Sequence, residues 1–284
     1  MVSNWKSNAD APEMDGVQYH IQCKAGDVAP SVLLPGDPGR TDLIAAAWDE
    51  SHLVASNREH RTFTGVSGGA PISVTSTGMG GPSTSIAVEE LLRIGAKTFI
   101  RLGTCGAIQE NIKCGDLIIN TAAVRHDGAS TMYVEPLYPA SADYEVTLAL
   151  IEACERLGHP YHVGLTCSTG SFHCGQGRPG FRGYSQSFFE NIVDDMRRAN
   201  VLNFEMEAAT LFTMGNIYGF RSGCVCVAVA NRITNEMFSA PLEPAVEVCN
   251  LAVRILHERD AKTRALPVHG TVEELGKDNS CQSA

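Results

Sequence analysis

The stretch PISVTSTGMGGPSTSIAVEELLRIGAKTFIRLG (Pro71–Gly103) decides the fold class, because it holds two strand-like runs with a helical pattern between them. Pro71–Thr77 is rich in β-branched residues and Lys97–Gly103 is an apolar run, and both patterns are typical of strands. Thr84–Ile94 carries apolar side chains at helical spacing. A glycine-rich turn, GMGGPS, joins the first strand to this helix. The order strand, helix, strand indicates an α/β protein.

The same alternation continues on both sides of this stretch. Further strands are predicted at Ser31–Leu34, Asp116–Val124, Tyr161–Thr169 and Cys224–Asn231, with a short strand-like stretch at Leu53–Ser56. Further helices are predicted up to about Trp48 and at Ser141–Gly158, Phe188–Ala199, Glu207–Tyr218 and Pro244–Arg259. We expect one α/β domain, residues 17–260, with a mixed or mostly parallel sheet and helices on both faces. Residues 1–16 are predicted to be a flexible N-terminal segment, and residues 261–284 a loose polar tail.

Charge and composition narrow the class of protein. The net charge of −10 argues against nucleic acid or an anionic membrane as a partner, since proteins that bind polyanions normally present a basic surface. No apolar run approaches the ~20 residues that span a bilayer, and Met1–Gly16 lacks the apolar core of a secretion signal. The ten cysteines form no CxxC pair and fall largely in strand-like and helix-like runs, which favours reduced core thiols over zinc. We therefore expect a soluble, cytoplasmic protein.

Polar side chains stand within or just after several predicted strands, and Arg101 is the most informative. It lies between two apolar residues in a run that should be buried, and a buried guanidinium needs an anionic partner. Arg40 follows a glycine turn whose N–H groups can face an anion, and Thr104 adds a hydroxyl. Ligands of open α/β sheets bind beyond the carboxyl ends of strands, so these groups can form a phosphate cradle. An ion pair between Arg101 and a core glutamate is the alternative.

A second polar group, Glu205-Met206-Glu207, follows the apolar run VLNF. A carboxylate there can accept two hydrogen bonds from a vicinal diol such as ribose presents. The alternative is that the acid caps the helix that begins at this point. Gln176 and Arg178 lie in a glycine-rich stretch and, taken alone, suggest no more than a solvated loop.

Together these motifs resemble the uridine phosphorylases of the nucleoside phosphorylase superfamily, trimeric-or-hexameric class. The resemblance rests on LPGDPGR, STGMGGPSTSIAVEEL, FIRLGTCGAI, GDLIINTAAVRHDGAS, the F-x-x-x-Q-x-R pattern at Phe172–Arg178, and NFEMEAATL. It runs from about Tyr19 to Arg259, nearly the whole chain. The fold that it implies is a single α/β domain whose central mixed, twisted sheet is partly barrel-like and flanked by helices.

The resemblance implies a role for each position that matches a family motif. For phosphate these are Gly36, Arg40, Arg101, Thr104 and, from the neighbouring subunit, Arg58. For ribose they are Met206, Glu207 and His20, the last reaching across a dimer to the 5′-hydroxyl. For the base they are Gln176 and Arg178 at the uracil edge and Phe172 stacked beside it. Arg101, Glu207 and Arg178 are the implied catalytic residues, and Glu59, Met79 and Ser83 match positions that line a monovalent cation site between subunits in some relatives.

The resemblance also implies a reaction, the phosphorolysis of uridine to uracil and ribose 1-phosphate in pyrimidine salvage, by a homo-oligomer built on at least a two-fold dimer. Inorganic phosphate is the expected co-substrate, and no organic cofactor is expected. Purine members of this class carry a Ser-Asp pair after the late strand, where this chain has Asn231-Arg232. A purine or methylthioadenosine phosphorylase or nucleosidase, and a catalytically silent nucleoside-binding relative, are the alternatives.

Overall fold

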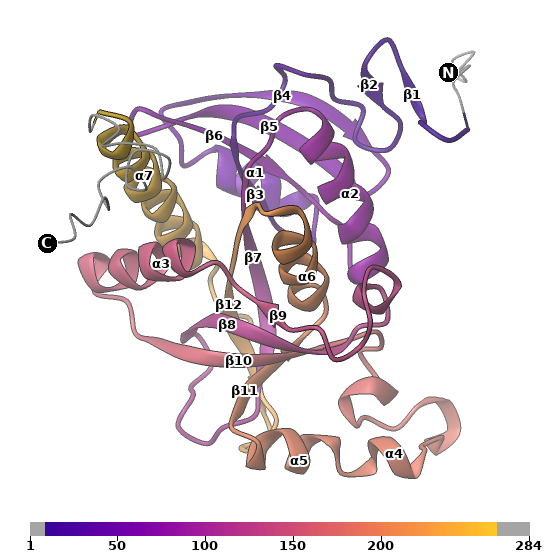
Figure 1. Cartoon of the computed structure of the whole chain (residues 1–284). Coiled ribbons are helices and arrows are strands. Elements are labelled where there is room, and N and C mark those ends of the chain that lie inside the picture. Colours follow the sequence, from indigo (N-terminus) through magenta and orange to yellow (C-terminus); the bar gives the residue numbers. More distant parts are fainter. Residues whose placement is uncertain (1–8, 266–284) are drawn as a thin grey trace, which may run out of the picture.

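The computed structural model describes residues 9–265 of the chain. A mixed β-sheet forms the centre of this part (Figure 1). The strands of this sheet are β3 (Ser31–Leu34), β4 (Glu50–Asn57), β5 (His60–Ser67), β6 (Ala70–Thr75), β7 (Thr98–Ala107), β8 (Leu117–His126), β9 (Ala140–Ser141), β10 (Tyr161–Thr169), β11 (Val201–Glu205), β12 (Arg221–Asn231) and β13 (Glu236–Met237). Their order is β13-β12-β8-β10-β11-β7-β3-β6-β5-β4, with β9 beside β8.

One additional pairing closes part of this sheet into a barrel. β7 pairs with β12 as well as with β11, so that β7, β12, β8, β10 and β11 form a ring. The strands from β3 to β4 extend from this ring as an open sheet. Parallel and antiparallel pairings both occur, because β12 is parallel to β7 but antiparallel to β8. The predicted fold, a mixed sheet that is partly barrel-like and flanked by helices, is confirmed.

β7 is the strand that holds the predicted phosphate arginine. It pairs in parallel with β3 and β12, and Arg101 stands opposite Leu34 on one side and Cys224 on the other. Neighbours on both sides leave Arg101 only 5% exposed, as the surrounding apolar run predicted. The side chain is therefore fixed in the middle of the molecule.

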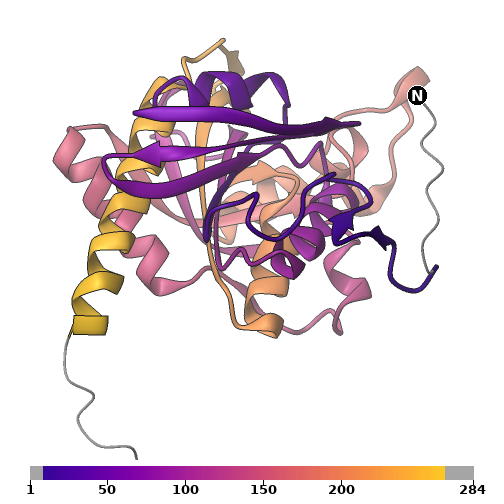
Figure 2. The same cartoon turned by 90° about the horizontal axis from the view of Figure 1, so that it is seen from above.

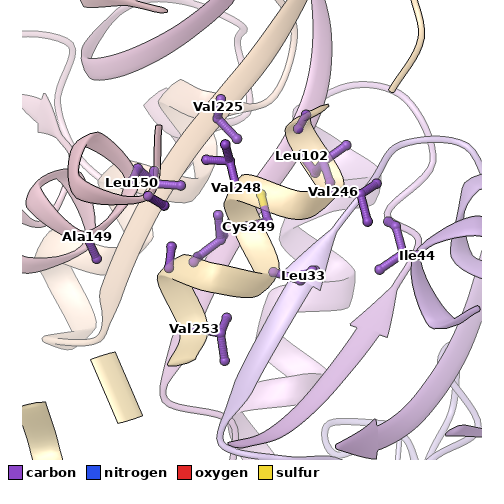
Figure 3. Packing of buried hydrophobic residues seen from close by; sticks show 14 of the residues in the cluster. Leu33, Ile44, Leu102, Ala149, Leu150, Val225, Val246, Val248, Cys249 and Val253 are labelled. Carbon is purple, nitrogen blue, oxygen red and sulfur yellow. The ribbon is translucent and has the colours of Figure 1, made fainter. Parts of the chain in front are cut away.

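Helices cover both faces of the sheet. They are α1 (Gly39–Ala45), α2 (Gly81–Arg93), α3 (Tyr144–Leu157), α4 (Ser187–Glu190), α5 (Ile192–Arg198), α6 (Ala208–Tyr218) and α7 (Glu243–Ala265). α1, α3 and α7 pack on one face, where Val246, Cys249 and Val253 of α7 belong to the same core cluster as Leu33 and Leu102 (Figure 3). α2 and α6 share a second core cluster with the opposite face. Each fully buried aliphatic side chain contributes about 1.5–3 kcal/mol, so both faces are strongly held.

The two ends of the described chain lie on opposite sides of the molecule (Figure 1 and Figure 2). A small hairpin pairs β1 (Glu13–Met14), which lies in the predicted flexible segment 1–16, with β2 (Val17–Gln18), which follows it. At the other end, α7 continues five residues past the predicted domain end at residue 260. The remainder of both predicted loose ends, residues 1–8 and 266–284, lies outside the described residues. None of the helices within residues 9–265 is both long and apolar enough to cross a bilayer.

Two local predictions differ from the structure. The hairpin of β4 and β5 was predicted only as a short stretch at Leu53–Ser56, because the first half of β4 is exposed and has no alternating pattern. The helix predicted at Phe188–Ala199 is two short helices, α4 and α5, that meet at Asn191. Asn191 has φ −104° and ψ 7°, outside the helical range, which accounts for the break.

Candidate active site

A cavity of about 830 Å³ lies at the carboxyl ends of β3, β6, β7, β11 and β12. Its lining consists of Gly36, Asp37, Pro38, Arg40, Glu59, Gly78, Met79, Ser83, Arg101, Gly103, Thr104, Cys105, Gly106, Phe172, Gln176, Arg178, Phe204, Glu205, Met206, Glu207, Val229, Ala230 and Met237. Every predicted site residue except His20 and Arg58 is in this lining. Ligands of sheets of this kind bind in the same place, beyond the strand ends.

Arg101 pairs with two buried carboxylates. Its Nε donates to Oε2 of Glu205 at 2.9 Å, and its Nη2 lies 2.5 Å from Oε2 of Glu207. Burial by itself would lower the pKa of Arg101, but Glu207 and Glu205 outweigh it and raise that pKa well above the ordinary value. Arg101 therefore does form the ion pair with a core glutamate that was the alternative explanation from the sequence. The fork still has N–H groups that neither glutamate uses, since a guanidinium carries five.

Glu205 is held by donors on every side. Its Oε2 also accepts the backbone N–H groups of Glu207 at 2.8 Å and Ala208 at 2.9 Å, at the start of α6. Its Oε1 accepts the hydroxyl of Ser168, which in turn accepts the N–H of Ala209 at 2.8 Å. Glu205 therefore caps the helix and orients Arg101 at the same time. Helix capping was the alternative role considered for an acid of this group, and Glu205 takes that role.

Glu207 is 4% exposed and faces the cavity. Its Oε1 accepts the N–H of Gly80 at 2.5 Å, which ties the glycine-rich turn before α2 to the start of α6. Residue 81 must be glycine for steric reasons, because a Cβ at Gly81 would lie 2.4 Å from Oγ1 of Thr210. Burial raises the pKa of Glu207, and Arg101 acts in the opposite direction. Two carboxylates share one guanidinium here, so Glu205 and Glu207 compete for the charge of Arg101.

The predicted phosphate residues gather around the turn after β3. Arg40, at the start of α1, lines the cavity together with Gly36 and Thr104. Burial lowers the pKa of Arg40, Asp37 raises it, and the nearby Arg101 lowers it further. Arg101 lies close enough to lower the pKa of Arg40, and two neighbouring guanidinium groups favour an anion between them.

The predicted base residues line the same cavity and contact one another. Arg178 Nη1 donates to Oε1 of Gln176 at 2.6 Å and to the carbonyl of Phe172 at 2.7 Å, and its guanidinium lies 4.0 Å from the Phe172 ring centroid. Nε2 of Gln176 donates to Oγ1 of Thr169 at 3.0 Å, which fixes the orientation of the amide. Burial, followed by the charge of Arg232, lowers the pKa of Arg178 to about 10. Hydrogen-bond donors therefore dominate this group of residues.

No role was predicted for Arg232 from the sequence beyond its place beside Asn231. Its Nη1 donates to the carbonyl of Gln176 at 3.0 Å, and burial lowers its pKa. The Asn231 amide is fully used by the backbone: it donates to the carbonyls of Gln109 and Ile112 and accepts the N–H groups of residues 233 and 234. Asn231 is therefore a structural residue of the strand end, and it contributes no acid to the cavity.

His20 and Arg58 lie together on the outside of the same chain. Arg58 occupies the β4–β5 turn with φ 54° and stacks over Tyr19, 5.7 Å from its ring centroid. Asn57 donates to the backbone carbonyl of His20 at 2.7 Å. Contacts of their chain neighbours thus bring these two residues near each other, and both are absent from the cavity lining of their own chain.

The predicted cation-site residues line one rim of the cavity. Oγ of Ser83 lies 2.8 Å from Oε1 of Glu59 and 2.5 Å from the carbonyl of Thr77, so its single proton serves two acceptors. Nδ1 of His60 faces the carbonyl of Ser76 at 3.0 Å, which leaves Nε2 as a buried acceptor without a hydrogen-bond partner, 3.9 Å from Oε1 of Glu59. Among residues 9–265 no group of three or more His, Cys, Asp or Glu side chains could hold a metal ion.

Comparison with known proteins identifies the family. Residues 30–258 match the profile of the phosphorylase superfamily. The chain is 60% identical over 260 residues to a uridine phosphorylase of Thermococcus kodakarensis, covering 92% of this chain and 94% of that protein. A uridine phosphorylase of Escherichia coli is 42% identical over 243 residues, covering 84% and 95% of the two chains, and a guanosine phosphorylase of Halorubrum lacusprofundi is 39% identical over 223 residues, covering 78% and 87%. The resemblance predicted from the motifs is confirmed, and the chain belongs to the phosphorylase superfamily.

Proposed function

We propose that this protein catalyses the phosphorolysis of uridine to uracil and ribose 1-phosphate, a step of pyrimidine salvage. One observation carries the proposal: a single cavity is lined by the arginines Arg40 and Arg101, by Glu207 paired with Arg101, and by the donor-rich Gln176–Arg178 pair. An anion, a sugar diol and a pyrimidine edge need these three environments. The uridine phosphorylases that resemble the chain support the same reaction.

Inorganic phosphate is the co-substrate, and Gly36, Arg40, Arg101 and Thr104 hold it. Arg101 keeps its Glu205 and Glu207 contacts and offers its remaining N–H groups to phosphate oxygens. Arg40 has no carboxylate within salt-bridge distance among the described residues, so its charge is available to the anion. Positioning and charge, with no covalent enzyme intermediate, provide the catalysis.

Bond breaking separates charge along the cavity. A phosphate oxygen attacks C1′ as the bond from C1′ to N1 of uracil breaks, so positive charge develops on the ribose and negative charge on the base. Phosphate and Glu207 stabilise the sugar, whose hydroxyls contact Met206 and Glu207. Gln176 and Arg178 stabilise the leaving uracil, beside the ring of Phe172. Uracil takes up the proton that the phosphate gives up, so the atoms balance.

A purine substrate fits this cavity less well. A purine leaving group needs a proton at N7, and the acids that line the cavity are Asp37, Glu59, Glu205 and Glu207. None of these four acids belongs to the segment that carries the base residues Gln176 and Arg178. The side-chain amide of Asn231 already makes hydrogen bonds to backbone groups, so it offers no proton to N7. The guanosine phosphorylase among the relatives nevertheless makes guanosine a necessary comparison substrate.

We also propose that the active site is shared in a two-fold homodimer, with His20 and Arg58 entering the cavity of the neighbouring copy. Their joint position outside their own cavity supports this arrangement. A monovalent cation between the copies, held by Glu59, Met79 and Ser83, would neutralise the excess of acceptors at that rim. The nine described cysteines are free thiols, which fits a reducing compartment such as the cytoplasm.

Product analysis tests the proposed reaction. Uridine, inosine and guanosine are each incubated with the protein, with and without phosphate, and free base and sugar phosphate are measured by chromatography. We expect uracil and ribose 1-phosphate from uridine only when phosphate is present, and very slow turnover of both purine nucleosides. Turnover of uridine without phosphate, or turnover of a purine nucleoside as fast as uridine, contradicts the proposal.

A further inference from the structure

Glu90 is a buried carboxylate of α2 that lies outside the cavity lining and is directed at the N-terminal segment. It is 4% exposed, and it accepts the backbone N–H of His20 at 2.9 Å and that of Ile21 at 2.9 Å. Its Oε1 also lies 2.6 Å from Nδ1 of His20. Three donors from two consecutive residues thus converge on one carboxylate.

The contact with Nδ1 fixes where the imidazole carries its proton. An ionised carboxylate can only accept hydrogen bonds, so Nδ1 of His20 must be the donor. In a neutral imidazole the other nitrogen, Nε2, then presents a lone pair. The His20 side chain is 25% exposed, and within residues 9–265 no hydrogen bond to Nε2 is found. The backbone is held too, because Asn57 of β4 donates to the carbonyl of His20 at 2.7 Å.

We propose that Glu90 is a positioning residue that holds His20 with its proton on Nδ1, so that Nε2 accepts a hydrogen bond from the 5′-hydroxyl of the nucleoside in the neighbouring copy. The inference rests on the proposed function and on the proposed entry of His20 into that site. It adds a specificity element that lies outside the cavity of either copy and acts through the tautomer of one side chain.

A purely structural role for Glu90 is the competing explanation. The backbone N–H groups of His20 and Ile21 would by themselves make Glu90 an anchor for the N-terminal segment. Glu90→Gln separates the two roles, because the amide oxygen can still accept a backbone N–H. The amide nitrogen would then face Nδ1 and favour the tautomer that carries its proton on Nε2. Glu90→Gln therefore keeps an acceptor for the backbone N–H groups of His20 and Ile21 but removes the acceptor for Nδ1 of His20.

Kinetics with two substrates test the proposal. Uridine and 5′-deoxyuridine are compared by kcat/KM in the unchanged protein, His20→Ala, Glu90→Gln and the double variant. We expect Glu90→Gln to lower kcat/KM for uridine about 2- to 12-fold, the range spanned by one hydrogen bond, and to leave 5′-deoxyuridine unchanged. In the His20→Ala background, Glu90→Gln should have no further effect on the ratio of the two substrates.

Glu89→Gln is the matched control, because Glu89 is the adjacent residue of α2 and its carboxylate accepts the Tyr218 hydroxyl at 2.7 Å instead. It should leave the substrate ratio unchanged. Long-range proton–nitrogen NMR of histidine-labelled protein adds a measurement that needs neither turnover nor a stable Glu90 variant, with the His20 signal assigned by its loss in His20→Ala. We expect a protonated Nδ1 and an unprotonated Nε2.

Several outcomes overturn the inference. If Glu90→Gln slows both substrates equally, Glu90 is only an anchor for the N-terminal segment. If it slows neither substrate, Glu90 does not position His20. His20→Ala can leave the preference for uridine over 5′-deoxyuridine intact, which would remove the role of His20. A proton on Nε2 in the NMR spectrum contradicts the tautomer itself. Failure of the proposed function looks different, because the unchanged protein would then turn over neither substrate while the NMR result could still hold.

Discussion

Replacing Arg101 by lysine separates its structural role from its proposed role in phosphate binding. The arginine fork spans Glu205 and Glu207 with two different nitrogen atoms, at 2.9 Å and 2.5 Å. A lysine keeps the positive charge, but its three donors sit on one nitrogen and cannot satisfy both carboxylates and also face the cavity. Losing one charge-assisted hydrogen bond costs about 1.5–3 kcal/mol. If that bond is the one to phosphate, the phosphate KM should rise about 10- to 150-fold.

The assay is a phosphate titration at saturating uridine, combined with thermal unfolding with and without phosphate. A ligand that binds only the folded protein raises its Tm, so the shift caused by phosphate should shrink in Arg101→Lys. Arg125→Lys is the control for structural damage. Arg125 donates to Oγ of Ser130 and to the carbonyls of Ser130, Val134, Glu135 and Tyr138, and it is absent from the cavity lining.

We expect Arg125→Lys to lower the Tm without changing the phosphate KM. The reasoning is refuted if Arg101→Lys lowers the Tm in the same way and its phosphate KM stays within about two-fold of the unchanged protein, a difference smaller than the loss of one such bond. Arg101 would then be a core ion-pair residue and nothing more.

Four further predictions concern other parts of the molecule. Glu207→Gln should reduce the preference for uridine over 2′-deoxyuridine about 2- to 12-fold, measured as a ratio of kcat/KM values, because the amide is the weaker acceptor for the ribose diol. Arg178→Ala should lower turnover of uridine but leave the Tm shift caused by phosphate intact; loss of that shift would mean that Arg178 is misplaced. Chains with Arg58→Ala and chains with Glu207→Ala, inactive alone, should regain about a quarter of the active sites after refolding together, by counting over a two-fold dimer; mixed dimers without activity would place the site within one chain. Among the described cysteines, only the half-exposed Cys114 and Cys174 should react with iodoacetamide in the folded protein, as measured by peptide mass spectrometry, because the other seven of the nine are buried.

The sequence predicted the elements whose patterns are strong. Ser31–Leu34 and Tyr161–Thr169 match β3 and β10 residue for residue, because both runs are bounded by clear turn signals. Arg101 could be recognised because a charge inside an apolar strand has few explanations. The β4–β5 hairpin was underpredicted because a strand with exposed residues on both faces has no period to detect.

The supporting residues of the site could not be predicted in the same way. Ser168 and Glu90 are single polar residues in otherwise ordinary strand and helix patterns, and their partners lie 37 and 70 residues away in the chain. Such contacts depend on the packing of distant elements and leave no local signal. The sequence placed Glu205 beside the site, but its contact with Arg101 spans 104 residues and required the pairing of β11 with β7.

The pairing of β7 with β12 also determines when, during translation, the barrel can close. Arg221 of β12 donates to the hydroxyl of Thr98 of β7 across 123 residues of chain. At about 5–20 residues per second, a ribosome needs roughly 6–25 seconds to make the segment between them. For that time β7 lacks β12, and for most of it β11 as well, and an unpaired strand edge with apolar flanks is a site of aggregation. The barrel therefore closes late in translation, and the yield of active protein should depend on how well the nascent chain is protected until β12 has emerged.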